Sequence, residues 1–184
     1  MVTLDELISW TDPLLFTKTE KFDFANPQID PKELFRRMSE AMIKHKGLGL
    51  SANQIGIPLS VFVFGDPESP NEIIPVFNPV IVDHSTDKMI MNESCLSFPG
   101  FFVKVPRYLQ IRARFANHHG VVNTIKFENL SARIFQHEFD HLQGMTIIHK
   151  LSRLQIERNV KKILKQYGNS CKYESGKLWT LVRT

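Results

Sequence analysis

The sequence has little cysteine and no long apolar run. Only two of its 184 residues are cysteines, Cys95 and Cys171, which is too few for a disulfide framework and favours a reducing compartment. No uninterrupted apolar stretch approaches the ~20 residues that span a bilayer. Residues 1–6 lack the basic start and the apolar core of an export signal. We therefore expect a cytoplasmic protein without a membrane segment.

The chain also lacks internal repeats, low-complexity tracts and linker-like segments. Its 184 residues are 42% hydrophobic and 23% charged, which is the composition of a globular protein with a core of useful size. We expect one domain over residues 1–184.

Positive charge is concentrated at the end of the chain. Residues 150–184 hold nine lysines and arginines against two acidic residues, so they carry +7, and the rest of the chain carries −3 of the net +4. A basic segment on a mildly acidic body is typical of a protein that meets a polyanion. A solvated helix face has the same composition, and charge alone does not decide between the two.

The first predicted helix begins near residue 30. Asp30 is a capping residue, Pro31 suits the first turn, and Glu33 would complete a capping box, while Gly47 would end the helix. Apolar residues recur at helical spacing between these signals, at Leu34, Met38 and Met42.

Two more helices are predicted in the second half of the chain. One begins at Asn129 or Ser131 and ends at Gly144, and its buried side is expected to hold Leu130, Ile134 and Leu142. The other covers about 152–167, opens on a capping box and is closed by Gly168. Its apolar face is expected to hold Ile156, Val160, Ile163, Leu164 and Tyr167.

Strands are predicted from β-branched and aromatic runs and from alternation. The runs at 61–64 and 75–82 read as strands, and 109–115 and 121–127 read as a hairpin. The tail at 168–184 fits either a short strand or a docked segment. The order of elements predicts an α+β fold in which antiparallel strands pack around a central helix, followed by a C-terminal helix.

The central helix carries a pattern associated with metal chemistry. His137 and His141 are four residues apart, so both imidazoles lie on one helix face and can reach one metal ion. Glu138 can act on a water that such an ion activates. A helix can also carry these residues by chance as solvated side chains, so the pattern alone is moderately specific.

A cysteine upstream of this helix raises the specificity. Cys95 lies in a loop-like segment at 93–100 and offers a third ligand. Three protein ligands and an open fourth position are typical of a catalytic metal site. Thiolate and imidazole suit ferrous iron and zinc alike, so these ligands do not identify the metal.

Attack of water on a carbonyl requires two further functions. Glu138 is the candidate for taking a proton from the water and giving it to the leaving group. The oxyanion that forms requires hydrogen-bond donors. The side-chain amide of Gln54 and the backbone N–H of Leu96 are the two candidates.

Taken together, these segments resemble the motifs of the peptide deformylase family. The family carries Gly-φ-Gly-φ-Ala-Ala-x-Gln (φ being apolar), Glu-Gly-Cys-Leu-Ser and Gln-His-Glu-x-Asp-His-Leu. Here they read Gly-Leu-Gly-Leu-Ser-Ala-Asn-Gln at 47–54, Glu-Ser-Cys-Leu-Ser at 93–97 and Gln-His-Glu-Phe-Asp-His-Leu at 136–142. Their order and separations also match, and the resemblance is to bacterial or phage-encoded members.

The resemblance implies an activity and a set of roles. Members of the family are metal-dependent hydrolases that remove the formyl group from N-formyl-methionine of nascent polypeptides and release formate. Their metal is typically Fe²⁺, which Zn²⁺, Ni²⁺ or Co²⁺ can replace. The carried-over roles are metal binding for Cys95, His137 and His141, acid–base catalysis for Glu138, and oxyanion binding for Gln54 and Leu96.

The resemblance also implies how the substrate lies. The main chain near Leu48, Gly49 and Ser94 is expected to pair with the peptide as an added strand. Leu130 and Ile134, with the first metal histidine, are expected to form an apolar pocket of the size of a methionine side chain.

The chain departs from the family motifs at two positions. Ser94 replaces the glycine before the cysteine, and Ser51 replaces an alanine. Neither change removes a catalytic group, so we expect activity to persist and the preference for substrate length to change. The aromatic residues within 98–102 are expected to form a wall beside the site.

Two acidic residues near the motifs are expected to support the site rather than to react. Glu93 would pair with Arg107 and brace the cysteine loop. Asp140, three residues after His137, would assist from the helix surface or from behind the ligands.

The resemblance also implies a partner for the basic C-terminal helix. Bacterial members of the family use a basic C-terminal helix to contact the ribosome, which gives residues 152–167 a candidate partner. We expect a monomer. Two other functions stay open: a metallopeptidase of the His-Glu-x-x-His type, which Cys95 and Gln54 argue against, and a ribosome-binding relative without turnover, which the intact catalytic groups argue against.

Overall fold

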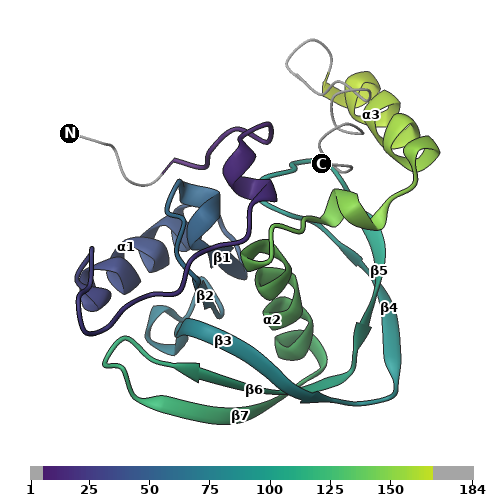
Figure 1. Cartoon of the computed structure of the whole chain (residues 1–184). Helices are drawn as coiled ribbons and strands as arrows, with labels where there is room; N and C mark the ends of the chain where they lie inside the picture. The colour runs from purple at the N-terminus through teal and green to yellow at the C-terminus, as the bar shows by residue number, and fades with distance from the viewer. Residues whose placement is uncertain (1–5, 168–184) are drawn as a thin grey trace.

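A computed structural model describes residues 6–167 (Figure 1). Over these residues the fold has three α-helices and seven strands, with short 3₁₀ turns between them. The helices are α1 (Pro31–Lys44), α2 (Asn129–Leu142) and α3 (Arg153–Tyr167). The strands are β1 (Gly49–Ser51), β2 (Val61–Phe64), β3 (Ile74–His84), β4 (Lys88–Glu93), β5 (Val103–Tyr108), β6 (Gln110–Ala116) and β7 (Val122–Glu128).

The strands form two antiparallel sheets. One has the order β1-β2-β3-β6-β7, and the other consists of β4 and β5 alone. Figure 1 shows α2 running between the two sheets, and α2 contacts strands of both. The predicted α+β class and the central position of the helix with the two histidines are therefore confirmed. Among residues 6–167, no helix is both long and apolar enough to cross a bilayer.

The first predicted helix forms over the expected residues, with one difference at its start. The carboxylate of Asp30 accepts the backbone N–H of Glu33 at 2.9 Å, as the capping pattern predicts. The predicted return bond from Glu33 does not form. The Glu33 carboxylate instead pairs with Arg36 at 2.7 Å, because a cation one turn later is the stronger partner for a charged group.

The strand predictions were right for β2, β3 and the β6–β7 hairpin. The hairpin pairs Gln110 with Glu128 at one end and Ala116 with Val122 at the other. The β4–β5 sheet was missed. Strand β4 is exposed at every position except Glu93 and so has no alternation to detect, and Pro106 in β5 argued against a strand there.

The core around α2 is largely aromatic. Ala132, Phe135 and Leu142 pack against side chains of the larger sheet, including Phe62 and Phe115. Because the ring of Phe135 meets Phe62 edge-on at 4.9 Å between centroids, the helix is held at a defined height above the sheet. This packing sets the rotation of α2 about its own axis, and therefore the direction in which its two histidines point.

One prediction about the buried side of α2 was wrong. Leu130 is 53% exposed, and Ile134 is only half-buried, whereas Leu142 is fully buried. Both line a cavity beside the helix, and Ile134 also packs against the core cluster. Helical spacing identifies apolar positions but does not separate a core from a cavity wall.

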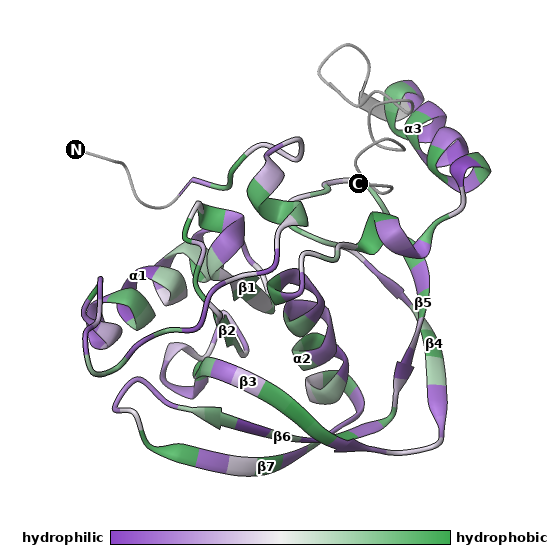
Figure 2. Cartoon of the chain, viewed as in Figure 1, coloured by the Kyte–Doolittle hydropathy of each residue, from purple (hydrophilic) through white to green (hydrophobic). Residues whose placement is uncertain are grey.

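Helix α3 packs against the segment that follows Cys95. Ile156, Val160 and Ile163 are buried in one cluster with Cys95. Leu164, predicted on the same face, is 40% exposed, because it lies at the margin of the apolar stripe. Figure 2 shows hydrophobic and hydrophilic residues alternating around this helix. The Ser152–Gln155 capping box is present, with Ser152 N–H donating to the Gln155 side chain at 2.8 Å.

Several predictions fall on residues that the structure does not describe. The tail at 168–184, the helix stop at Gly168 and the cysteine at Cys171 lie outside the described residues. The predicted apolar position Tyr167 ends α3, and its side chain is likewise outside the description.

Candidate metal centre

Two elements bring three metal-binding side chains together. Helix α2 presents His137 and His141 one turn apart, and the turn after β4 presents Cys95. One ligand atom from each residue lies within 4.8 Å of the other two, and Cys95 Sγ is 3.2 Å from His141 Nε2. Within residues 6–167 no other group of histidine, cysteine and carboxylate side chains converges in this way.

The donor set fits a divalent transition metal. Two imidazoles and one thiolate suit zinc or ferrous iron and leave a coordination position open. Burial lowers the pKa of His141 well below its usual value, and the nearby charges of His137 and Arg107 act in the same direction. His141 is therefore neutral at physiological pH, which is the form that binds a metal.

Glu93 holds the first histidine in place. Its carboxylate accepts from His137 Nδ1 at 3.1 Å, so the other ring nitrogen, Nε2, is left to face the site. Arg107 donates two bonds to the same carboxylate, at 3.0 Å each, which confirms the predicted brace. Burial by itself raises the pKa of Glu93, but the hydrogen bonds from His137 and Arg107 outweigh it and lower the pKa to about 2.

A second arginine completes this buried network. Arg133 donates to Glu93 at 2.5 Å and to two backbone carbonyls, those of Met89 and Val105. Arg133 thereby ties α2 to the β4–β5 sheet. Sequence analysis missed this residue. The available signal was its position one turn before His137, on the same helix face.

Asp140 lies behind the ligands, as predicted. Its carboxylate accepts from Arg107 at 2.6 Å and pairs with Lys150 at 3.1 Å. Arg107 therefore bridges Glu93 and Asp140, which fixes the cysteine segment relative to α2. Within residues 6–167 the Asp140 carboxylate contacts these two cations and not the metal-binding group, so the position of Asp140 is a supporting one.

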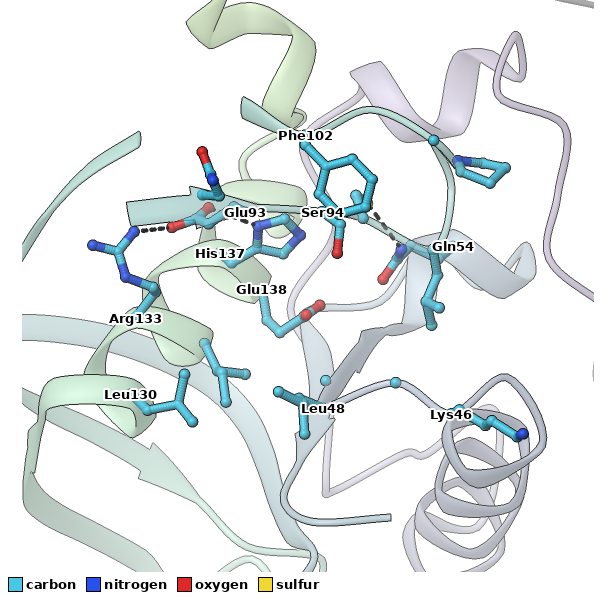
Figure 3. A pocket seen from close by; sticks show the side chains of 18 residues that line it. Lys46, Leu48, Gln54, Glu93, Ser94, Phe102, Leu130, Arg133, His137 and Glu138 are labelled. Atoms are coloured by element: carbon cyan, nitrogen blue, oxygen red, sulfur yellow. Dashed lines mark hydrogen bonds and ion pairs between the residues drawn. The ribbon is translucent and has the colours of Figure 1, made fainter. Parts of the chain in front are cut away.

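The carboxyl group of Glu138 lies against β1. Glu138 is 3% exposed, and its Oε2 accepts from the Ser51 hydroxyl at 2.5 Å. Burial raises the pKa of Glu138, while the charge of His137 and the hydrogen bond from Ser51 oppose the rise. Figure 3 shows the side chain directed into the cavity next to His137.

The amide of Gln54 is fixed at both ends. Its Oε1 accepts the backbone N–H of Ser51 at 2.9 Å, and its Nε2 donates to Ser97 Oγ at 3.0 Å. The same nitrogen is 3.6 Å from Cys95 Sγ. The NH₂ group therefore faces Cys95 (Figure 3), and the oxygen is held by the backbone of β1.

Most of the predicted site residues border one cavity of about 510 Å³. Gln54, Leu96, Glu138, Cys95 and His137 line it, and His141 completes the metal group behind them. The residues that the resemblance assigned to the substrate also line it: Leu48, Gly49, Ser94, Leu130 and Ile134. Figure 3 shows Leu48 and Leu130 on the same side of Glu138.

The predicted aromatic wall is only one residue wide. Phe98 and Phe101 are fully buried in the core beneath α3, so they do not face the cavity. Phe102 alone stands at the cavity rim, 63% exposed (Figure 3). These two rings instead form part of the apolar surface on which α3 packs.

Comparison with known proteins agrees with this geometry. The polypeptide deformylase family profile matches residues 4–157. The chain belongs to this family. A peptide deformylase of Aquifex aeolicus is 35% identical over 87% of this chain and 96% of its own length, and chloroplastic peptide deformylase 1B of rice is 32% identical over 92% of this chain and 62% of its own length.

Solved structures of the family have the same fold. The peptide deformylase of Legionella pneumophila has a TM-score of 0.82 at 26% identity and covers 94% of this chain and 100% of that one. That of Thermotoga maritima has a TM-score of 0.74 at 33% identity, covering 81% and 98%. As a member of this family, the chain is a metal-dependent hydrolase that removes the N-formyl group from nascent polypeptides.

Proposed function

We propose that Cys95, His137 and His141 hold the catalytic metal of this deformylase and that Glu138 and Gln54 act on the substrate beside it. The observation that carries this proposal is the convergence of the three ligand atoms on one another, beside a cavity that the buried carboxylate and the amide of Gln54 also line. A divalent metal bound there would polarise the formyl carbonyl and acidify the attacking water.

Glu138 is the group that moves the proton. Its carboxylate takes a proton from the attacking water and delivers it to the amine nitrogen that leaves, so the products are formate and a free N-terminus. The carboxyl is nearly inaccessible to bulk solvent, which keeps the transferred proton within the site. Burial also raises its pKa, which makes it a better base than an exposed glutamate.

Gln54 and Leu96 supply the oxyanion donors. The amide of Gln54 is held so that its NH₂ group faces the cavity before substrate arrives. Within residues 6–167 the backbone N–H of Leu96 donates to no protein acceptor, so it is available as a second donor. Donors that are oriented in advance stabilise a developing negative charge without reorganising.

The substrate binds as an extended strand. Among residues 6–167, strand β1 is at the edge of its sheet and pairs with β2 alone, so its other edge near Leu48 and Gly49 can pair with the peptide, with Ser94 opposite. The methionine side chain enters between Leu130 and Ile134. Both are apolar and incompletely buried, so burying them against a ligand is favourable.

The decisive assay is formate release from a formyl-Met-Ala peptide. Glu138→Ala is expected to lower kcat by about 10²- to 10⁴-fold and to keep its metal. Glu68→Ala, which changes an exposed loop glutamate, should have no effect. Full turnover by Glu138→Ala would refute the acid–base role. Release of free amino acids from unformylated peptides would favour the metallopeptidase instead.

The native metal is proposed to be Fe²⁺, with Zn²⁺, Ni²⁺ or Co²⁺ as substitutes. A thiolate with two imidazoles accepts each of these ions. Purification without oxygen, followed by elemental analysis, should find about one equivalent of iron. Zinc as the dominant ion in such a preparation would overturn the assignment of iron.

Helix α3 is proposed to contact the ribosome. Arg158, Lys161, Lys162 and Lys165 are exposed, and the opposite face is packed on the domain. Changing the three lysines to glutamate should abolish salt-sensitive co-sedimentation with ribosomes and leave formate release from a free peptide unchanged. Unchanged co-sedimentation would mean that this face is merely solvated and does not contact the ribosome. Ribosome binding without any formate release would identify a non-catalytic relative.

The monomeric state, the cytoplasmic location and the single domain over residues 1–184 stay predictions. Sedimentation of the purified chain would test the first of them directly.

A further inference from the structure

Strand β1 forms a close-fitting seat for the Glu138 side chain. Gly49 and Ser51 are two residues apart, so they present the same face of the strand to α2. A Cβ atom on Gly49 would lie 2.5 Å from Glu138 Oε1 and 2.9 Å from its Cγ and Cδ. The Glu138 side chain therefore occupies the space that a Cβ atom on Gly49 would need, so any larger residue there would require the glutamate to move.

Ser51 closes this seat with a hydrogen bond. The residue is fully buried, and its hydroxyl is 2.5 Å from Glu138 Oε2 and 3.2 Å from the backbone carbonyl of Glu138. The hydroxyl has a single proton, which goes to the nearer and charged acceptor. Within residues 6–167, Ser51 is the sole protein donor to the Glu138 carboxylate.

We propose that Ser51 is a positioning residue: its hydroxyl holds the Glu138 carboxylate in the rotamer that faces the attacking water. The inference rests on the proposed role of Glu138. The family motif carries alanine at this position, so the hydroxyl is an addition in this chain and adjusts the site rather than creating it.

The hydroxyl restricts a motion that the seat alone allows. Gly49 limits how closely β1 approaches Glu138, but it offers no directional bond, so the carboxyl group can still turn about its last torsion, which has a broad minimum. A hydrogen bond to one carboxylate oxygen of Glu138 fixes that torsion, and it thereby fixes the direction in which the other oxygen points. Fixing a reacting group in advance raises kcat without changing ground-state binding of the substrate.

The test compares Ser51→Ala with Ser51→Thr in the metal-loaded full chain. Alanine removes only the hydroxyl and is the residue of the motif, so the variant is expected to fold. Misplacing a general base costs part of its 10²- to 10⁴-fold contribution, so kcat of Ser51→Ala should fall about tenfold, with KM within about twofold. Threonine keeps the hydroxyl and should restore most of kcat.

A matched control separates positioning from the loss of any buried hydroxyl. Ser39→Ala removes a hydroxyl that bonds the Phe35 carbonyl on α1, away from the site, and should leave kcat unchanged. A value of kcat for Ser51→Ala within about twofold of wild type overturns the proposal. So does a parallel change of KM and kcat that threonine does not restore, because that pattern indicates a structural role.

A crystallographic readout is independent of turnover. Wild type should show one rotamer of Glu138, and Ser51→Ala should show more than one, with the metal retained in both. An unchanged single rotamer in Ser51→Ala overturns the proposal. If wild type releases no formate, the proposed reaction is wrong, and the rotamer comparison still decides whether Ser51 positions Glu138.

Discussion

At the scale of single residues, Glu93 connects the metal site to the rest of the fold. Its carboxylate accepts bonds from His137, Arg107 and Arg133 and is buried with both arginines. Within residues 6–167, Arg133 pairs with no other acidic side chain, and Arg107 shares its charge between Glu93 and Asp140, so the network is fully satisfied only while Glu93 is ionised. The same charge sets the orientation of the histidine ring.

Glu93→Gln should therefore affect both stability and the metal. Neutralising one member of a buried charge network is expected to cost about 3 kcal/mol of unfolding free energy, and losing the support of a metal ligand about 10- to 100-fold in metal affinity. Urea unfolding and competition with a metal chelator measure the two effects. Glu33→Gln, which breaks the exposed pair with Arg36, should change neither. Wild-type metal affinity in Glu93→Gln would show that the ring needs no such support.

Individual residues also show how far the sequence could be interpreted. Helical spacing placed His137 and His141 on one face, and the motif supplied Cys95. The Ser51–Glu138 bond joins residues 87 positions apart, and no local pattern encodes such a contact. Arg133 was hidden for a related reason, because an arginine among apolar positions reads as a surface residue until its buried partner is known.

At the scale of elements, α3 stabilises the cysteine segment. The apolar face of the helix packs on the cluster that contains Cys95, Phe98 and Phe101. Gly100 lies beneath the helix, where a Cβ would meet Ile163 at 3.3 Å. The helix therefore fixes the segment from which one metal ligand comes, even though no side chain of α3 up to residue 165 lines the cavity.

Two substitutions on α3 separate packing from surface composition. Ile156 is fully buried, so Ile156→Ala should cost about 2–4 kcal/mol of unfolding free energy and loosen the Cys95 segment. Leu164 is 40% exposed, and Leu164→Ala should cost well under half as much. Urea unfolding of both variants tests this difference. Equal losses would mean that the margin of the stripe is also part of the core.

A 3₁₀ turn, η4 (Ile147–Lys150), should make stability depend on pH. His149 Nδ1 accepts the backbone N–H of Thr146 at 3.0 Å, which requires an unprotonated nitrogen. Burial lowers the pKa of His149 below its usual 6.5, and the charge of Lys150 acts in the same direction. The unfolded chain therefore binds this proton first, so stability from His149 is present above about pH 6.5 and is lost as pH falls.

The His149→Gln variant isolates this contribution. Between pH 7.5 and 5.5 the wild type should lose more unfolding free energy than the variant, by at most about 1.4 kcal/mol per pH unit below 6.5. Urea unfolding at matched ionic strength measures both slopes. Identical slopes would show that His149 titrates normally in the folded chain.

The elements themselves were unevenly predictable. Alternation of apolar and polar residues identified the β6–β7 hairpin, because one of its faces is buried. Strand β4 has no buried face before Glu93 and is held by pairing with β5, from Lys88 with Tyr108 to Glu93 with Val103. Backbone pairing of this kind leaves little trace in side-chain pattern.

At the scale of the whole molecule, the metal group links distant parts of the chain. Cys95 follows β4 in the smaller sheet, and both histidines belong to the helix that packs on the larger sheet. An ion held by all three residues would therefore join the two sheets through α2. Binding to the folded chain alone must raise the free energy of unfolding.

Metal removal should consequently lower stability, and Cys95→Ala should abolish the effect. With Zn²⁺ at 100 times its dissociation constant, the wild type is expected to gain about 2.7 kcal/mol over the chelator-treated chain. Cys95→Ala removes one of three ligands and should show little gain at the same concentration. His119→Ala, on the turn between β6 and β7, is the matched control and should gain as much as the wild type. Thermal and urea unfolding with and without Zn²⁺ make the comparison, and an equal gain in Cys95→Ala and wild type would place the stabilising ion somewhere other than this group.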